Sequence, residues 1–388
     1  MGCGRLKPDP PRLYDQAESS YQAGRLDEAD LRAGAAYRQL LSAYPQLAGK
    51  FQILHVQIML DRGLNEEALT QLNNSPPQIF ATCELAARRY MLEATTYFRI
   101  GRYPESESSL QKAAGLCGEA GPGLAADLAT RRGVILDDPV TAEKDYRVAL
   151  AISSQQHDTF REAGALLNLA NATQDQEHYD ESIEFGQASL QLSRGKGYKL
   201  YEEKAEGNLA WDYYKLGDLD QALALFQEAE EAARSLGSGP DQIRWLKNLG
   251  LVHEQNGQLK VAETKYRQAL ALAQHQGDKF QTAIASGELA YALIRISEWE
   301  QAGKFSQQTI EFARQEQDRP LELRGLFAQG LIASHNGDQK TAENLLAEVA
   351  RDPGHDRQSL RWEAQAALAD LYAKSRNRPR PRLNIKSR

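Results

Sequence analysis

Apolar and small residues recur along this chain at steps of three and four, which is the pattern of a helix with one buried face. The same pattern returns at a longer interval of forty residues. One column of small residues holds Ala170, Ala210, Gly250, Ala290 and Gly330, and a second column, twelve residues later, holds Ser182, Ala222, Ala262, Ala302 and Ala342. No stretch shows the two-residue alternation of a half-buried strand. The sequence therefore predicts an all-α fold in which each repeat is a pair of packed helices.

A turn lies between the two small columns of each repeat. Glycine holds this turn in most repeats, because glycine adopts the left-handed conformation that ends a helix at no steric cost. Glu177 and Ser297 hold it in two others. The turn glycines are Gly24, Gly63, Gly101, Gly217, Gly257 and Gly337. We predict about nine helix pairs, which begin near residues 10, 49, 87, 126, 163, 203, 243, 283 and 323, and a final helix over 361–374.

The small and aromatic positions of one repeat, Leu249-Gly250, Ala262, Tyr266 and Ala269, resemble the pattern of the tetratricopeptide repeat. The resemblance covers roughly residues 10–375 and implies a right-handed superhelical solenoid whose first helices line a concave, partner-binding face. The forty-residue repeats with Asn-Leu-Ala also resemble those of kinesin light chains. Their arrangement resembles the repeat half of bacterial proteins that carry a caspase-like CHAT domain, although no CHAT domain follows in this sequence. Residues 1–9 are predicted to be a disordered N-terminus, and residues 376–388 a basic disordered tail.

The composition narrows the classes of partner. The chain has 388 residues and a formal net charge of −7, and its hydrophobic content of 41% and charged content of 26% are typical of a folded protein. A net-acidic chain is not expected to coat nucleic acid, so we interpret the basic tail as a solvated segment. No stretch reaches the roughly 18 consecutive apolar residues of a membrane span. We expect a protein or peptide partner, with no nucleic acid, no small-molecule substrate and no cofactor.

The three cysteines, Cys3, Cys83 and Cys117, give neither a disulfide framework nor the spacing of a zinc site. A reducing compartment is the simplest explanation, so we predict a cytoplasmic protein. Gly2-Cys3 also matches the end of a bacterial lipoprotein signal, but the apolar segment that should precede it is absent. If the true start lies upstream, the alternative is a lipid anchor through Cys3, and membrane contact is expected only in that case.

We predict that the chain is not an enzyme, because no group of residues has the spacing of a catalytic motif. His253-Glu254 is followed by Gln255-Asn256-Gly257, which breaks the His-Glu-x-x-His metal motif. His253 lies on the packing stripe of its helix and is interpreted as a core residue. Gly195-Lys196-Gly197 and Gly237-Ser238-Gly239 lack both the preceding strand and the Gly-Lys-Ser/Thr ending of a phosphate-binding loop. We interpret both glycine pairs as linkers between repeats.

Asparagine recurs at forty-residue spacing immediately before the leucine and small residue of three repeats. Asn168, Asn208 and Asn248 lie one step around the helix from the packing positions, on the side that faces the groove. An asparagine side chain carries both a donor and an acceptor, so it matches the amides of an extended peptide. Peptide-binding tetratricopeptide domains use asparagine in this way, and the resemblance extends to Asn171. The alternative is that each asparagine bonds within its own repeat.

Other groove positions carry mostly cations and aromatic rings, with Asp175, Glu254 and Glu288 as the only acids counted there. Arginine and aromatic side chains are frequent anchors of interfaces. We therefore predict a locally basic groove that binds an acidic, partly apolar segment. The complete predicted peptide-binding set is Asn168, Asn171, Lys204, Asn208, Trp211, Tyr214, Lys215, Arg244, Lys247, Asn248, Tyr291, Arg295 and Arg324.

The leading functional hypothesis is a non-catalytic interaction scaffold that binds an extended peptide in its concave groove. The alternative is a sensor or regulatory array for a CHAT-type, caspase-like protease whose catalytic domain is not in this chain. A peptide-responsive transcriptional regulator is disfavoured, because fewer than fifteen residues precede the first repeat and a helix-turn-helix needs about 60.

Overall fold

The computed structural model describes residues 10–116, 121–136, 138–354 and 358–376. This part of the chain holds α-helices and one short 3₁₀ helix, and no strand. The predicted all-α fold is therefore confirmed. The predicted disordered ends, including Cys3 and most of the basic tail, lie outside the described residues, as does Cys117.

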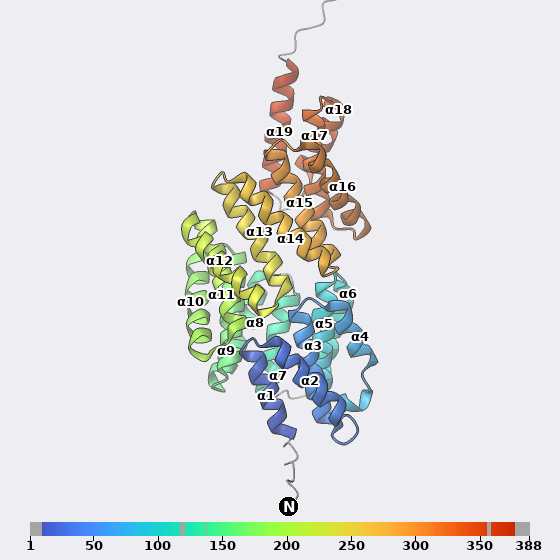
Figure 1. The fold of residues 1–388 in the computed structure, drawn as a ribbon, viewed down its shortest axis with the longest axis vertical. Helices are drawn as coiled ribbons and strands as arrows, with labels where there is room; N and C mark the ends of the chain where they lie inside the picture. Colours follow the sequence, from blue (N-terminus) through green and yellow to red (C-terminus); the bar gives the residue numbers. More distant parts are fainter. Residues whose placement is uncertain (1–9, 117–120, 137, 355–357, 377–388) are drawn as a thin grey trace, which may run out of the picture. The chain divides into compact units, whose positions relative to one another are not determined.

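The helices follow one another as consecutive pairs with short turns, and a last helix follows the ninth pair (Figure 1). The pairs are α1 (Pro10–Gln22) with α2 (Leu26–Leu40), α3 (Pro45–Asp61) with α4 (Asn65–Asn74), α5 (Cys83–Arg99) with α6 (Tyr103–Leu116), α7 (Pro122–Ile135) with α8 (Pro139–Gln155), α9 (Thr159–Asp175) with α10 (Tyr179–Lys196), α11 (Lys199–Leu216) with α12 (Leu219–Leu236), α13 (Gly239–Gln255) with α14 (Leu259–His275), α15 (Lys279–Arg295) with α16 (Trp299–Gln315), and α17 (Arg319–His335) with α18 (Gln339–Arg351). The 3₁₀ helix η1 (Pro77–Phe80) precedes α5. The final helix α19 (Gln358–Arg376) extends beyond the predicted 361–374 at both ends.

Several helices begin at an aspartate that caps them. The side chain of Asp218, for example, accepts a hydrogen bond from the Gln221 amide at 3.1 Å. Such a bond satisfies one of the backbone donors that the first turn of a helix leaves unpaired. The same arrangement recurs at Asp138, Asp158, Asp278, Asp318 and Asp338. These caps fix where the helices start and so hold the period of the repeats.

The turn between paired helices uses the left-handed conformation, as predicted. Gly217 has φ 86° and Gly257 φ 71°. Glu177 and Ser297, which the sequence pattern treats as exceptions, adopt the same conformation with φ 60° and 66°. An L-residue with a Cβ pays on the order of 1 kcal/mol for this conformation. The geometry of the turn is therefore retained even where glycine is not.

The chain divides into two compact units, residues 1–252 and 253–388, and the division falls near the end of α13. In the first unit, the predicted small columns close-pack, since Ala210 and Ala222 are fully buried around Phe226 and Trp245. In the second unit, Phe327, Leu346 and Val349 form a comparable cluster between α17 and α18. The small residues let paired helices approach closely while a large residue fills the adjacent space.

Within the first unit, the N-terminal helices contact helices that are about 170 residues away in sequence. Leu200 of α11 is buried in the same cluster as Leu26 and Ala29 of α2, and Leu236 packs on that cluster. The Ser238 hydroxyl donates to the carbonyl oxygen of Asp61 at 3.2 Å. The first unit therefore brings α1, α2 and α3 together with α11, α12 and the start of α13.

Cys83, at the start of α5, is disulfide-bonded. This corrects the expectation that the cysteines form no disulfide. Because disulfides persist mainly in oxidising compartments, the bond weakens the argument from cysteine usage for a reducing one. Among the helices of the described residues, none combines the length and apolarity needed to cross a membrane.

Candidate functional site

The predicted asparagines lie on three successive first helices of the first unit. Asn208 of α11 is only 6% exposed, and its Nδ2 donates to Oδ1 of Asn171 on α9 at 2.6 Å. Asn168 and Asn248 are half-buried, and neither makes a side-chain hydrogen bond to another residue in the part of the chain that the structure describes. The Asn208–Asn171 bond uses one of two donors and one of two acceptor lone pairs, so the pair keeps hydrogen-bonding capacity.

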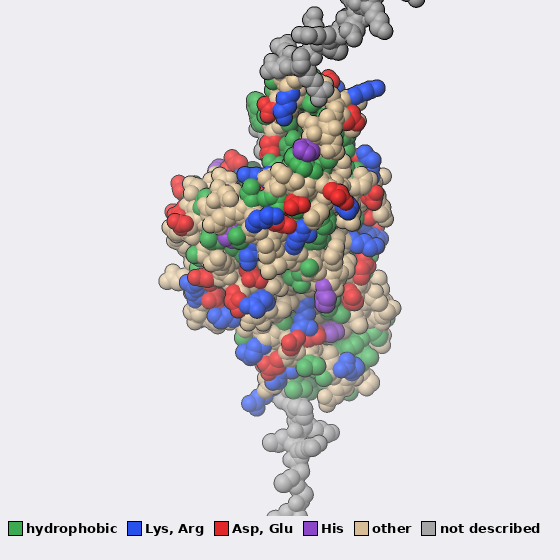
Figure 2. Space-filling view, turned by 45° about the horizontal axis from the view of Figure 1, so that its top comes forward, with side chains coloured by type: hydrophobic (Ala, Val, Ile, Leu, Met, Phe, Trp, Pro, Cys, Tyr) green, Lys and Arg blue, Asp and Glu red, His purple; other side chains and the backbone are tan. Residues whose placement is uncertain are grey.

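Four of the six cations of the predicted basic groove lie beside carboxylates. In the first unit, Lys204 forms an ion pair with Asp241, and Arg244 lies 3.2 Å from the same carboxylate. In the second unit, Arg324 lies 2.6 Å from Glu288, and Arg295 lies 3.7 Å from Glu254. Basic and acidic side chains are also interspersed over the face drawn in Figure 2. The sequence count had included Glu254 and Glu288 but not Asp241, and these three carboxylates offset the charge of the four cations beside them. A locally basic groove stays a prediction.

The aromatic members of the predicted set are also packed within their own unit. Trp211 and Tyr214 of α11 have ring centroids 5.4 Å apart, and Tyr214 makes further contacts. Tyr291 of α15 lies 6.1 Å from Phe327, and its hydroxyl donates to Glu363 at 3.2 Å. Lys215 is exposed, and Lys247 is half-buried and engaged by a neighbour. The predicted set thus falls into ten residues in the first unit and three in the second.

Asp241 is the centre of a buried charged group in the first unit. It is 4% exposed and accepts from Ser238 Oγ at 2.7 Å, in addition to its pairs with Lys204 and Arg244. Burial alone would raise the pKa of Asp241, but the neighbouring ammonium and guanidinium groups hold it well below its usual value. The carboxylate is therefore charged at neutral pH and links α11 to α13.

A second charged group joins three first helices. Asp127 of α7 lies 2.5 Å from Arg88 of α5 and 2.8 Å from Arg161 of α9. Burial opposes the charge on Asp127, but these two guanidinium groups leave its pKa below the usual value. These ion pairs therefore connect α5, α7 and α9 within the first unit.

Asp212 of α11 is fully buried with polar partners on the preceding repeat. Its carboxylate lies 2.8 Å from Gln174 Nε2 and 2.7 Å from Ser182 Oγ. Ser182 Oγ also lies 3.0 Å from the Ala170 carbonyl oxygen, and its single proton can serve only one of these acceptors. Burial raises the pKa of Asp212 to about 6, against the lowering effect of the two hydrogen bonds.

This pKa predicts a pH-dependent stability that Asp212→Asn removes. A carboxyl whose pKa is raised on folding binds a proton more tightly in the folded state, so stability falls as pH rises from about 4 to about 6. The shift from 3.8 to about 6 corresponds to roughly 2–3 kcal/mol. We expect Asp212→Asn to be more stable than the wild type by about 2 kcal/mol at pH 7 and no more stable at pH 4. Urea denaturation at both values, followed by circular dichroism, measures the difference; equal stabilities at pH 7 would contradict it.

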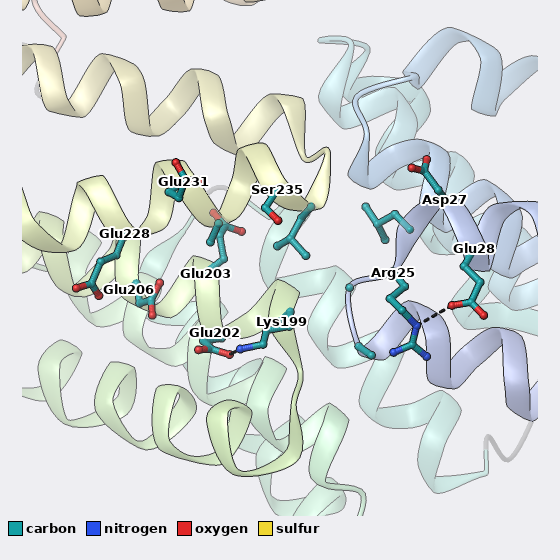
Figure 3. A pocket seen from close by; sticks show the side chains of 15 residues that line it. Arg25, Asp27, Glu28, Lys199, Glu202, Glu203, Glu206, Glu228, Glu231 and Ser235 are labelled. Atoms are coloured by element: carbon teal, nitrogen blue, oxygen red, sulfur yellow. Dashed lines mark hydrogen bonds and ion pairs between the residues drawn. The ribbon is translucent and has the colours of Figure 1, made fainter.

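A cavity of about 830 Å³ opens in the first unit between α11 and α12 on one side and the α1–α2 turn on the other (Figure 3). Its lining carries seven carboxylates and two cations. The carboxylates are Asp27, Glu28, Glu202, Glu203, Glu206, Glu228 and Glu231, and the cations are Arg25 and Lys199. Both cations are already paired, Arg25 with Glu28 at 2.7 Å and Lys199 with Glu202 at 2.6 Å. We call this space the acidic cavity.

Glu203 stands apart from the other carboxylates of the acidic cavity. It is 0% exposed, and its Oε1 accepts from the indole Nε1 of Trp245. Its other oxygen, Oε2, is buried without a hydrogen-bond partner in the described residues. Burial raises the pKa of Glu203, and the nearby Asp241 carboxylate raises it further. A buried carboxyl with an unused oxygen is costly, and such atoms are rare in folded proteins.

Sequence reasoning did not find the acidic cavity. Its two walls come from segments around residues 23–28 and 199–236, and nothing in a repeat pattern shows which distant repeats meet. The sequence did contain a signal, since Glu202, Glu203 and Glu206 form an acidic cluster at the start of α11. On a single helix, however, such a cluster is usually a solvated face.

The predicted core role of His253 is confirmed. The residue is 7% exposed, and its Nδ1 lies 2.6 Å from Gln258 Oε1.

Among the described residues, no group of three or more histidine, cysteine or acidic side chains is placed to hold a metal ion. The acidic cavity is therefore lined by carboxylates that are too dispersed to form a compact cation site.

The tetratricopeptide repeat model matches residues 161–235 and 201–275 of this chain. A search of curated proteins finds no match. The chain therefore contains tetratricopeptide repeats from α9 to α14, as the sequence pattern predicts.

Solved structures extend the fold match to nearly the whole chain. A Rap protein complexed with competence and sporulation factor is similar with 14% identity and a TM-score of 0.59, covering 94% of this chain and 98% of the other. NprR in complex with its cognate peptide NprX has 16% identity and a TM-score of 0.55, with 84% and 99% covered. A signal transduction ATPase with a tetratricopeptide repeat sensor, from Pyrococcus horikoshii, has 17% identity and a TM-score of 0.55. The match covers 90% of this chain and 55% of the ATPase chain. These likenesses show the repeat fold.

Proposed function

We propose that this protein is a non-catalytic scaffold that binds an extended peptide along the first helices of its first unit. The observation that carries the proposal is the row of asparagines on α9, α11 and α13. Asn208 and Asn171 already face each other across two helices at 2.6 Å, so their amides are held in place before a ligand arrives. Pre-organised amides can meet the backbone of an extended peptide without the cost of ordering their own side chains.

The comparisons support a peptide or protein partner. Two proteins of the same fold are described with a bound partner, competence and sporulation factor in one and the peptide NprX in the other. The proposed recognition does not rest on the acidic segment expected from the sequence, because Lys204 and Arg244 are already engaged by Asp241. The peptide is instead recognised through its backbone by the asparagine row and through apolar side chains by Trp211 and Tyr214.

A second candidate function is a sensor array that regulates an effector domain. It is favoured by the likeness to the ATPase described as having a tetratricopeptide repeat sensor, of which this chain spans 55%. The resemblance to CHAT-domain proteins stays a prediction about the identity of that effector. So do the cytoplasmic location and, as its alternative, the lipid anchor through Cys3.

The proposed peptide function is tested by a peptide-array screen of the full chain, followed by fluorescence polarisation with the strongest binder. We expect Asn168→Ala and Asn208→Ala to weaken binding about tenfold each, since each removes hydrogen bonds to the peptide backbone. Asn73→Ala, at an exposed position of the second helix α4, is the matched control and should bind like the wild type. Equal affinities of all three variants would contradict the proposal.

A further inference from the structure

The acidic cavity has a composition that the asparagine row does not explain. Seven carboxylates share one lining with two cations, and both cations are already paired inside the cavity. Some of the acids also have partners outside it: Asp27 pairs with Arg62, Glu206 lies 2.8 Å from Arg194, and the exposed Glu231 pairs with Arg234. Glu228 remains exposed on α12. The cavity is therefore an electronegative space, and the focusing of like charges in a recess favours cationic ligands.

The unpartnered oxygen of Glu203 is a second, independent observation that points to a ligand. Glu203 lines the acidic cavity, is 0% exposed and leaves Oε2 without a donor among the described residues. Trp245 fixes the carboxyl group by donating to its other oxygen. A buried polar atom without a partner needs an explanation, and in a cavity lining a bound group is one that supplies the missing hydrogen bond. Burial raises the pKa of Glu203 to about 8, so its carboxyl holds a proton at neutral pH; a cationic group at Oε2 would take the place of that proton and supply the missing hydrogen bond.

The shape and the apolar part of the lining select the kind of cation. The cavity volume of about 830 Å³ is far larger than a hydrated metal ion, and it falls in the range of sites for organic ligands. The carboxylates are not gathered into a metal-binding group in the described residues. Ala23, Leu26, Ala232 and Leu236 line the space between them. A chain of methylene groups between two or more cationic ends fits both the apolar and the acidic parts.

We propose that the acidic cavity binds an organic polycation, in which protonated amine or guanidinium groups on an aliphatic stem donate to Glu203 Oε2 and to Glu228 and Glu231. Two sources carry this chemistry: a free polyamine and a peptide segment with adjacent lysine and arginine. The site is separate from the proposed peptide row, since none of Asn168, Asn171, Asn208 and Asn248 lines the cavity. The test of polycation binding can therefore succeed or fail independently of the test of the proposed function.

Isothermal titration calorimetry of the full chain tests the proposal with two probes, spermidine and a capped hexapeptide with a central Lys-Arg pair. A hexapeptide with a central Glu-Asp pair is the reversed-charge control. We expect the wild type to bind at least one cationic probe and not the acidic peptide. Binding of spermidine alone assigns the site to a free polyamine, and binding of the Lys-Arg peptide alone assigns it to a chain segment; both results support the shared chemistry.

Substitutions in the lining locate the binding. The combined exposed variant Glu228→Gln and Glu231→Gln should weaken cation binding about tenfold, because it removes two charges while leaving the buried residues intact. Glu203→Gln should also weaken it at least tenfold, since an amide cannot carry the negative charge and can place its NH₂ donor where a cation would need an acceptor. Glu184→Gln removes one exposed charge from α10, outside the cavity, and should change binding less than twofold.

Three results would overturn the proposal. They are the absence of binding of both cationic probes, equal affinities in the Glu228→Gln, Glu231→Gln variant and in Glu184→Gln, and full displacement of the bound probe by Mg²⁺ at matched ionic strength. If Glu203→Gln does not fold, the exposed double variant alone decides the matter. Asn208→Ala should leave polycation affinity unchanged, so the result separates this site from the peptide row.

Discussion

Replacing Asp241 with alanine is expected to destabilise the first unit by about 3–5 kcal/mol. Asp241 is 4% exposed and compensates two cations, Lys204 and Arg244, while it also accepts from Ser238. Removing one partner of a buried ion pair leaves the other charge desolvated and unpaired, which costs about 3–5 kcal/mol. The loss should be transmitted to α3, because Ser238 also donates to the Asp61 carbonyl oxygen.

Urea denaturation followed by circular dichroism at pH 7 measures this loss. Glu184→Ala is the matched control, since it removes an exposed carboxylate from α10, and it should change stability by no more than about 0.5 kcal/mol. The variant Asp241→Asn keeps the shape and the hydrogen bond but not the charge, and it should lose most of the same stability. If Asp241→Ala has the same urea midpoint as the wild type, the prediction is contradicted, and Lys204 is not held by this carboxylate.

Gly207→Ala is the second substitution with a large expected effect, a destabilisation of about 2–3 kcal/mol. A Cβ on Gly207 would fall less than 3.0 Å from three atoms of the Trp245 indole, with Cε2 at 2.7 Å. Trp245 cannot move aside easily, because it is 1% exposed, packs on Phe226 and donates to Glu203. Overpacking of this kind costs about 1–3 kcal/mol, and it outweighs the gain of up to about 1 kcal/mol from higher helix propensity.

The control for this prediction is Gly303→Ala in the second turn of α16, where a Cβ would meet no described atom within 4 Å apart from its chain neighbours and the nearby backbone of its own helix. There the propensity effect acts alone, and the variant should gain about 0.5–1 kcal/mol. Combining Gly207→Ala with Trp245→Leu removes the clash, so the two changes should be strongly non-additive in a double-mutant cycle. Additive effects, measured by urea denaturation, would contradict the role assigned to the indole.

The sequence predicted the helix pairs well because their determinants are local. The spacing of Ala210 and Ala222 and the turn at Gly217 are all contained within one repeat, and the structure confirms the buried small residues and the left-handed turn. The aspartate caps were an additional local signal, present at Asp218, that the pattern of apolar residues did not use. The start of α19 was missed by three residues and its end by two, because the ends of helices fray and their boundaries are poorly defined.

The candidate sites were less predictable, because they depend on which side chains meet between repeats. Lys204 was assigned to a ligand, and its partner Asp241 lies 37 residues away on the next first helix. A helix period shows that both face the same side but not that they touch. The acidic cavity depends on contacts between segments that are still farther apart in sequence, residues 23–28 and 199–236. Whether the asparagine row binds peptide stays a prediction.

Hydrogen–deuterium exchange of the full chain, with and without the strongest peptide from the array, tests the central claim most directly. An extended peptide on the asparagine row should slow exchange in the middle of α9, α11 and α13, around Asn168, Asn208 and Asn248, and leave the second helices α10 and α12 unchanged. The Asn208→Ala variant should lose this protection at the same peptide concentration. Protection confined to α10 and α12, or none at a peptide concentration that saturates binding, would contradict the account.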